Sequence, residues 1–306
     1  MGTRRRALVT GATGFVGSHL VPALLDAGWD VAVLARDPRR LGDHDWRDRV
    51  EVMQGGVDDG PALRDALEGA DVAYYLIHSM AGSYDYARED RVLAKLFVAA
   101  AAAAGVSRLV YLGGLYPEDA TLSEHLASRK EVGEILLRGP VPSAVLQAGI
   151  VIGAGSASFE MLGTAVRLPL IVGPTWLDNN VQPISLRDAL HYLVGSASLP
   201  SDVDRAFDIG APESLTYREL IHMFAQVAER RAPAIVTVPI ALPRTASLWA
   251  GILSPGPTAL NAALVHSLTL DMVCREHDIG DYIEPPVGGR QHVAQAIGIA
   301  LHTPGT

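Results

Sequence analysis

Short runs of apolar residues alternate with longer amphipathic segments along residues 1–150. The short runs are typical of strands buried on both faces, and the longer segments have the apolar spacing of helices. The predicted strands are 7–10, 30–35, 50–53, 71–77, 108–112 and 143–150, and the predicted helices are 15–25, one through 63 and 67 that ends near 69, 84–104 and 122–137. This alternation predicts an α/β fold, a doubly wound parallel sheet covered by helices on both faces.

The regular alternation weakens after residue 150. Helices are predicted at 159–168, 185–194 and 216–230, a strand at 206–209, and a Pro-punctuated stretch at 169–183 that contains Trp176. We therefore predict a doubly wound domain over 1–150 and a smaller C-terminal lobe over 151–306, with 181–210 partly returning to the sheet. The chain beyond Pro239 is rich in apolar residues, of which Trp249, Leu253, Leu260 and Leu264 can line a cavity, although core packing explains each more simply.

The first predicted strand and helix are joined by a glycine-rich turn. Residues 7–20 read ALVTGATGFVGSHL, so Gly11, Gly14 and Gly17 follow a strand and open a helix. Such a turn lets the backbone fold sharply and a pyrophosphate approach, while the helix N-terminus offers free N–H groups. We predict a dinucleotide site here, to which Thr13, Phe15 and Val16 also belong.

Other candidate cofactor contacts follow the ends of the next strands. Val57 follows the third strand, Ile77 and His78 end the fourth, and Gly113 ends the fifth. Open α/β sheets bind ligands at this carboxyl edge, which is why these positions are assigned to the cofactor. His78 is either functional or simply a hydrogen-bonded loop residue. Of the nearby Asp58 and Asp59, either can meet the adenine, but capping of the following helix is the better interpretation for Asp59.

The end of the second strand carries Arg36. An acidic side chain at this point binds the ribose 2′-OH of NAD, whereas an arginine pairs with the 2′-phosphate of NADP. Arg36 therefore favours NADP(H) over NAD(H). The alternative is that Arg36, Arg39 and Arg40 form a solvated cluster beside Asp37.

Composition narrows the class of protein. The chain has 306 residues, 49% of them hydrophobic, which is enough for a large core. A single cysteine, Cys274, excludes an internal disulfide, and we expect no metal site. The formal charge of -9 argues against nucleic acid as a partner, and we expect no membrane span. The apolar run that follows Arg4 to Arg6 is too short for a signal peptide, so we expect a cytoplasmic protein. We expect a monomer or a homodimer.

The motifs resemble one superfamily. GATGFVG, the Arg36 tip and the strand order are similar to the extended and atypical short-chain dehydrogenases/reductases over about residues 6–210. YLIHSM (75–80), LVYLGGL (109–115) and the segment 125–137 resemble an NAD(P)H-binding, NmrA-like branch. The resemblance implies a Rossmann domain that binds NAD(P) and a small C-terminal substrate lobe.

The sequence departs from the superfamily at its catalytic pair. The usual chemistry needs a Tyr four residues before a Lys, whose ammonium lowers the phenol pKa. The two lysines of the chain are Lys95 and Lys130, and no Tyr stands four residues before either. At the expected place stand His125 and Arg129. The serine expected after the fifth strand is also missing, and Gly56 stands where an adenine-binding Asp is usual.

We predict an NADP(H)-dependent oxidoreductase for a small apolar or aromatic substrate, such as a carbonyl, enone or quinone. His125 is the candidate proton donor, with Arg129 one helical turn on. Because Arg129 lowers the pKa of His125, a permanently protonated donor is disfavoured, and a neutral hydrogen-bonding role is the alternative. Water, His78 or Tyr84 are the alternative donors.

Two other functions stay open at this point. Without the Tyr, Lys and Ser, the fold can serve as an NADP(H)-binding sensor with no chemistry of its own. A non-redox isomerase or cyclase is the weaker option. The sequence holds neither a Gly-x-Ser-x-Gly elbow nor a His-Glu-x-x-His motif, so hydrolase and metalloprotease functions have no support.

Overall fold

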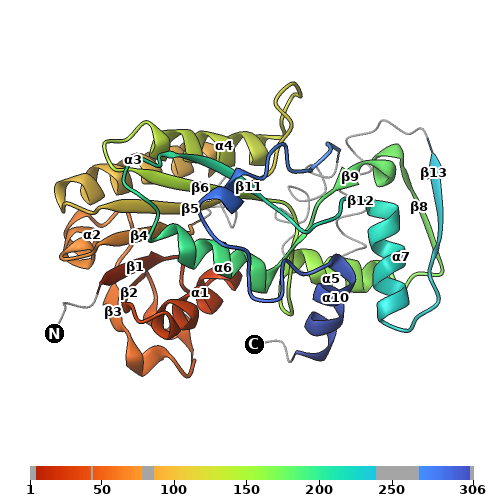
Figure 1. Cartoon of the computed structure of the whole chain (residues 1–306), viewed down its shortest axis with the longest axis horizontal. Coiled ribbons are helices and arrows are strands. Elements are labelled where there is room, and N and C mark those ends of the chain that lie inside the picture. The colour runs from red at the N-terminus through yellow and green to blue at the C-terminus, as the bar shows by residue number, and fades with distance from the viewer. Residues whose placement is uncertain (1–4, 43, 78–85, 239–268, 304–306) are drawn as a thin grey trace.

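A seven-stranded parallel sheet forms the centre of the chain (Figure 1). The computed structural model describes residues 5–42, 44–77, 86–238 and 269–303. The strand order is β11-β6-β5-β4-β1-β2-β3, and every neighbouring pair is parallel. The strands are β1 (Arg6–Thr10), β2 (Asp30–Ala35), β3 (Glu51–Gln54), β4 (Val72–Tyr75), β5 (Arg108–Gly114), β6 (Ser143–Ala148) and β11 (Arg205–Ile209).

Helices cover both faces of this sheet. The helices α1 (Phe15–Asp26) and α6 (Leu186–Ser196) pack on one face through residues such as Leu20 and Leu193. On the other face lie α2 (Gly60–Leu67), α3 (Tyr86–Ala103) and α4 (Glu124–Leu137), with Leu63, Phe97 and Leu136 in the core. The predicted α/β, doubly wound fold is confirmed.

Strands β1 and β4 are parallel neighbours in the sheet. From β1 the chain adds β2 and β3 on one side, and from β4 it adds β5, β6 and β11 on the other. At such a point the connections leave to opposite sides and open a crevice at the carboxyl ends of the strands. The Oγ1 of Thr10 donates a hydrogen bond to the carbonyl oxygen of Tyr74 at 2.8 Å, and the N–H of Leu76 donates to that Oγ1 at 3.4 Å. These two hydrogen bonds fix the end of β1, where the glycine turn begins, to the end of β4.

Most of the remaining elements form a smaller layer beside the sheet, on the right in Figure 1. Three helices share a third core: α5 (Ala157–Ala165), α7 (Tyr217–Val227) and α10 (Val293–His302). Three two-stranded sheets join β7 (Val151–Ile152) to β10 (Ile184–Ser185), β8 (Leu170–Pro174) to β13 (Ala234–Val238), and β9 (Asn180–Val181) to β12 (Leu215–Thr216). The 3-10 helices are η1 (Pro38–Leu41), η2 (Arg47–Arg49), η3 (Thr175–Asp178) and η4 (Asp278–Asp281).

The sequence did not predict these small sheets or α10. Strand β11 does pair with β6, as expected for a strand at 206–209. Trp249, Leu253, Leu260 and Leu264 lie outside the described residues. In the described part of the chain, no helix combines the length and hydrophobicity that crossing a bilayer requires.

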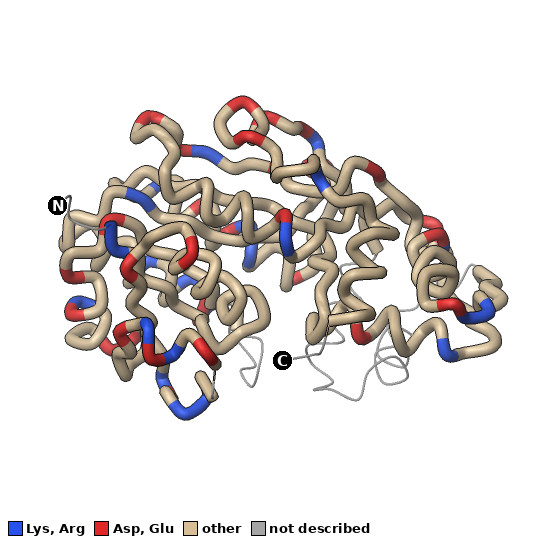
Figure 2. Tube along the Cα trace, turned by 60° about the horizontal axis from the view of Figure 1, so that its bottom comes forward, with Lys and Arg blue, Asp and Glu red and all other residues tan. Residues whose placement is uncertain are grey.

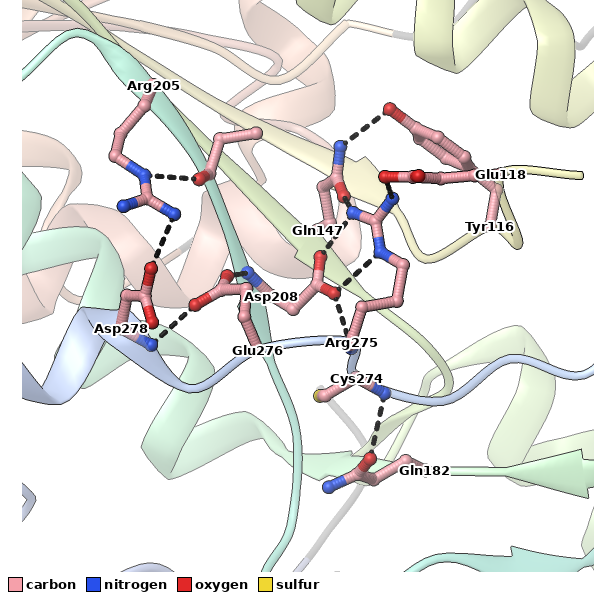
Figure 3. A network of polar contacts seen from close by, with 11 residues as sticks. Tyr116, Glu118, Gln147, Gln182, Arg205, Asp208, Cys274, Arg275, Glu276 and Asp278 are labelled. Carbon is pink, nitrogen blue, oxygen red and sulfur yellow. Dashed lines mark hydrogen bonds and ion pairs between the residues drawn. The ribbon is translucent and has the colours of Figure 1, made fainter.

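Arg275 ties the segment that precedes η4 to the edge of the main sheet (Figure 3). Its Nε and one terminal nitrogen donate to the two carboxylate oxygens of Asp208 in β11, at 3.0 and 2.9 Å. Asp208 is 1% exposed, so its charge has no access to water. The same guanidinium also donates to Gln147 of β6 and lies 5.0 Å from the ring centroid of Tyr116.

We predict that Arg275→Gln lowers the free energy of unfolding by roughly 2–4 kcal/mol, because it leaves the buried Asp208 carboxylate without its cation. Arg205→Gln is the matched control. Arg205 pairs with Asp278 at 2.8 Å, but both side chains are partly exposed to water, by 40% and 45%. We expect that change to cost about 1 kcal/mol or less. Denaturant unfolding measures both, and equal losses would contradict the role of burial at Asp208.

Candidate active site

A cavity of about 380 Å³ lies at the crevice between β1 and β4. Its lining begins at the glycine turn, passes the end of β5 and the first turn of α4, and continues between α5 and α7. Of the residues predicted for the site, it is lined by Gly11, Gly14, Phe15, Val16, Gly17, Gly113, His125 and Arg129. Positions far apart in the sequence are thus brought to one cavity.

The fold requires the three glycines of the turn to different degrees. Gly11 has a φ of +76°, and a Cβ on it would overlap the carbonyl group of Leu76. A Cβ on Gly17 would overlap the carbonyl of Gly11, so α1 can pack on the turn only without a side chain there. A Cβ on Gly14 would meet only the Gly11 oxygen, at 3.3 Å. Gly14 is therefore the glycine that the fold itself requires least.

Gly14 stands at the N-cap of α1, where no side chain caps the helix. The first-turn N–H groups of α1 therefore face the cavity mouth with the positive end of the helix dipole. A side chain on Gly14 would occupy the space in front of them. This open cradle fits a dinucleotide pyrophosphate, which is the group that glycine turns of this kind bind.

The end of β2 presents an unpaired cation. Asp37 is held by Arg39, whose Nε and terminal nitrogen donate to its two oxygens at 2.9 and 3.1 Å. This hydrogen bonding lowers the pKa of Asp37. The exposed Arg36, in contrast, has no ion pair or hydrogen bond through its guanidinium to any residue that the structure describes.

Asp58 and Asp59, in the loop after β3, have different contacts. Asp59 accepts a hydrogen bond from the N–H of Ala62 at 3.2 Å and caps α2, as predicted. The Asp58 carboxylate lies over Gly56, where a Cβ would overlap it. Val57 is buried in the core beside Leu63 rather than in the cavity lining.

The other predicted residues lie around the cavity or cannot be placed. Thr13 is half-buried in the turn, Ile77 packs against the core under α2, α3 and α4, and neither lines the cavity. His78 and Tyr84 lie outside the described residues. The contacts of these residues with a cofactor remain predictions.

Polar contacts fix α4, which carries His125 and Arg129. Ser123 caps the helix by accepting the N–H of Leu126 at 3.2 Å. Ser128 donates to the buried Asp90 of α3 at 3.0 Å, and Arg91 of α3 forms a two-pronged ion pair with Glu131. A terminal nitrogen of Arg129 donates to the carbonyl of Leu112 in β5 at 2.9 Å.

His125 is 7% exposed and faces the cavity from the first turn of α4. Burial lowers the pKa of His125 to about 3, and the positive charge of Arg129 lowers it further in the same direction. The imidazole is therefore neutral at physiological pH. Sequence reasoning identified the effect of Arg129, but burial is the larger cause.

The far wall of the cavity was not predicted from the sequence, apart from Trp176 as material of the C-terminal lobe. It is formed by apolar side chains of α5, η3, α7 and the segment after residue 268: Met161, Leu162, Trp176, Tyr217, Ile221 and Met272. Trp176 and Tyr217 meet edge to face, with ring centroids 6.3 Å apart. The amphipathic pattern of 216–230 was a signal for a buried face, but not for a face that lines a cavity.

Comparison with known proteins identifies the family. A family model described as NAD(P)H-binding matches residues 11–138. A reductase of Streptomyces griseus that acts on (4-alkanoyl-5-oxo-2,5-dihydrofuran-3-yl)methyl phosphate is 31% identical over 224 residues, which are 73% of this chain and 74% of that protein. The ceramide reductase of Caulobacter vibrioides is 30% identical over 257 residues, 78% of this chain and 76% of that protein.

A solved structure has the same fold. The NADPH-dependent quinone oxidoreductase of Escherichia coli, complexed with NADPH, superposes with a TM-score of 0.75 at 16% identity, covering 97% of this chain and 100% of that chain. The chain belongs to the NAD(P)H-binding family of atypical short-chain dehydrogenases/reductases. It is accordingly an NAD(P)H-dependent reductase or dehydrogenase.

We predict that Gly14→Val abolishes dinucleotide binding in a folded protein. The backbone at Gly14 has φ −87° and ψ 167°, which a β-branched residue adopts without strain. The added side chain blocks the α1 N–H groups, and losing roughly two charge-assisted hydrogen bonds weakens binding on the order of 10²-fold or more. Fluorescence titration with NADPH and circular dichroism measure the two properties.

Gly17→Val is the comparison variant, because it must separate α1 from β1 and is expected to destabilise the fold itself. If Gly14→Val bound NADPH like the wild type, this result would contradict the assignment of the pyrophosphate to the N-terminus of α1.

Proposed function

We propose that this chain is an NADPH-dependent reductase of apolar substrates with a carbonyl, enone or quinone group. The observation that carries this proposal is one continuous cavity that joins the glycine cradle, the neutral His125 and a wall of apolar side chains. Its volume of about 380 Å³ is in the range of small-molecule sites. A cavity of this size beside the cradle favours a reductase over a sensor without a substrate.

In the proposed reaction, the residues of the chain bind the substrate and stabilise the charge that develops during hydride transfer. When bound, NADPH supplies a hydride. His125, as a neutral imidazole, is suited to donate an N–H hydrogen bond to the substrate oxygen on which negative charge develops. A neutral histidine at a helix N-terminus can polarise a carbonyl in this way. The proton that finally neutralises the oxygen then comes from solvent.

Arg129 acts on this histidine from the next helical turn. Its hydrogen bond to the carbonyl of Leu112 holds the guanidinium near the end of β5. From there its charge helps to keep the imidazole neutral. We assign Arg129 as a positioning residue and His125 as the residue that contacts the substrate.

The apolar wall sets the class of substrate. Met161, Leu162 and Ile221 offer no hydrogen-bonding side chain, so an apolar group is expected against them. The two relatives are named for a ceramide and for a furanone methyl phosphate that carries an alkanoyl group. Both names agree with an apolar chain in this part of the cavity.

Arg36 supports NADPH as the preferred cofactor. Its unpaired guanidinium ends β2, where the adenine ribose of a dinucleotide is bound in this fold. The nearest carboxylate in the sequence, Asp37, is already engaged by Arg39. A 2′-phosphate would give Arg36 the partner that the described residues do not.

We predict that Arg36→Ala raises the Kd for NADPH roughly 10- to 10²-fold, the loss of a charge-assisted hydrogen bond, and leaves the Kd for NADH unchanged. Arg64→Ala, an exposed arginine of α2, is the control and should change neither. Fluorescence titration of the wild type and both variants with NADPH and NADH provides the dissociation constants. Equal weakening of NADPH and NADH by Arg36→Ala would contradict contact with the 2′-phosphate.

The reaction itself is tested by NADPH oxidation in a stopped-flow instrument against quinones, enones and ketones of increasing alkyl length. We expect turnover, with kcat/KM rising up to about fourfold per methylene buried in the apolar wall. Loss of NADPH absorbance with no acceptor present is the baseline. If no acceptor oxidises bound NADPH, the reductase is refuted and a sensor is favoured.

The same assay tests His125. Because its pKa lies near 3, the neutral form persists from pH 5 to pH 8, and we expect no step in kcat near pH 6.5 from this residue. A histidine acting as an imidazolium donor would instead lose activity as the pH rises. His125→Phe removes a hydrogen-bond donor to the developing oxyanion and should lower kcat by about 10²-fold, whereas His125→Gln, which keeps a neutral N–H donor, should retain most of it.

A further inference from the structure

The two-stranded sheet of β8 and β13 has one apolar face turned outward. Leu170, Val172 and Val236 are 49%, 43% and 50% exposed. The parallel register pairs Leu170 with Ala234 and Val172 with Val236, so these side chains share one face. Ile171, 3% exposed, points the other way into the third core. We call the exposed side of residues 170, 172, 234 and 236 the β8–β13 face.

Three arginines precede these strands at one end of the sheet. Arg167 comes before β8, and Arg230 and Arg231 come before β13; all three are exposed. The strands are parallel, and the N–H of Ala234 donates to the carbonyl of Pro169 at 3.1 Å, so both starts lie together. Figure 2 shows basic segments, with acidic ones beside them, at the end of the molecule far from the N-terminus.

These arginines form a local exception in an acidic chain. None of the three guanidinium groups has an ion pair or hydrogen bond with another described residue. The formal charge of the chain is -9, and the acidic residue that adjoins them in sequence is Glu229. At the other end of the sheet, by contrast, Arg218 is paired with Asp178 at 2.8 Å. The free positive charge is therefore concentrated beside one end of the β8–β13 face.

The sheet also stands close to the cavity. Gly173 of β8 leaves room for Leu177, because a Cβ there would overlap that side chain. Leu177 and its neighbour Trp176 line the cavity. The β8–β13 face is thus the outer side of a layer whose inner side supports the cavity wall.

We propose that the β8–β13 face is a docking surface for an anionic lipid bilayer. Exposed apolar side chains enter the headgroup region, and unpaired arginines beside them attract the negative surface; together they provide the two signals that stable peripheral binding needs. The charge favours an anionic bilayer over a neutral apolar partner, because a neutral partner would leave the three arginines without a counter-charge. The inference rests on the surface alone and holds whichever substrate the cavity takes.

The test is co-sedimentation of the full chain with vesicles of phosphatidylcholine that contain phosphatidylglycerol, and with vesicles of phosphatidylcholine alone. We expect binding to the anionic vesicles, weak binding to the neutral ones, and loss of binding at high salt. The triple variant Arg167→Gln, Arg230→Gln, Arg231→Gln should weaken binding roughly 10²-fold, since each arginine near an anionic surface contributes about fivefold.

A second variant, Val172→Glu with Val236→Glu, should abolish vesicle binding, because it places charge on the outward side chains. Matched controls lie on helices that cover the main sheet. Val92→Glu with Leu96→Glu changes two similarly exposed apolar residues of α3, and a triple Gln variant of Arg64, Arg88 and Lys95 removes three exposed cations of α2 and α3. Both controls should bind vesicles like the wild type, and all variants should keep NADPH affinity and thermal stability.

Several results would overturn the proposal: no binding to anionic vesicles, equal binding to neutral vesicles, or equal losses in the α3 control and the β8–β13 variant. Light scattering is run in parallel. A dimer that Val172→Glu with Val236→Glu dissociates, without vesicle binding by the wild type, would assign the face to a second copy instead.

Discussion

The start of α1 lies directly against the end of β1, with no side chain between them, and the site depends on this close approach. Gly17 has no room for a Cβ beside the carbonyl of Gly11, and Gly11 itself has no room for one beside Leu76 of the β4 connection. A side chain at either position would push α1 away from the sheet. The N–H groups of its first turn would then no longer face the crevice where the strand order reverses.

Polar contacts, among them the buried Ser128–Asp90 hydrogen bond, hold the other parts of the site in relation to this turn. Asp90 and Arg91 of α3 fix α4 through Ser128 and Glu131, so the first turn of α4 faces the cavity. Arg275 holds the segment that follows Met272, a residue of the far wall, to the buried Asp208 of the main sheet. Removing one partner of a buried ion pair costs more than the pair contributes, which makes such contacts effective in fixing one arrangement.

The nucleotide-binding part could be predicted from the sequence because its strands are continuous apolar runs and its glycines follow a spacing with a physical cause. The cap at Asp59 was predictable for the same local reason. The far wall was not, because its residues come from α5, η3, α7 and the segment after residue 268, which are distant in sequence and meet at one cavity only through tertiary packing. The sequence placed Arg129 beside His125, but the burial that chiefly lowers the His125 pKa depends on tertiary packing.

A nearby cation has opposite consequences for a tyrosine and for a histidine. Beside a phenol it lowers the pKa and creates a usable acid, but beside an imidazole it removes the proton that would be donated. His125 next to Arg129 is therefore a hydrogen-bond donor without being a strong acid. Under the proposed function, such a donor suits acceptors that spread the incoming negative charge over a conjugated system. Enones and quinones do so, whereas an isolated ketone concentrates that charge on one oxygen and depends more on a proton.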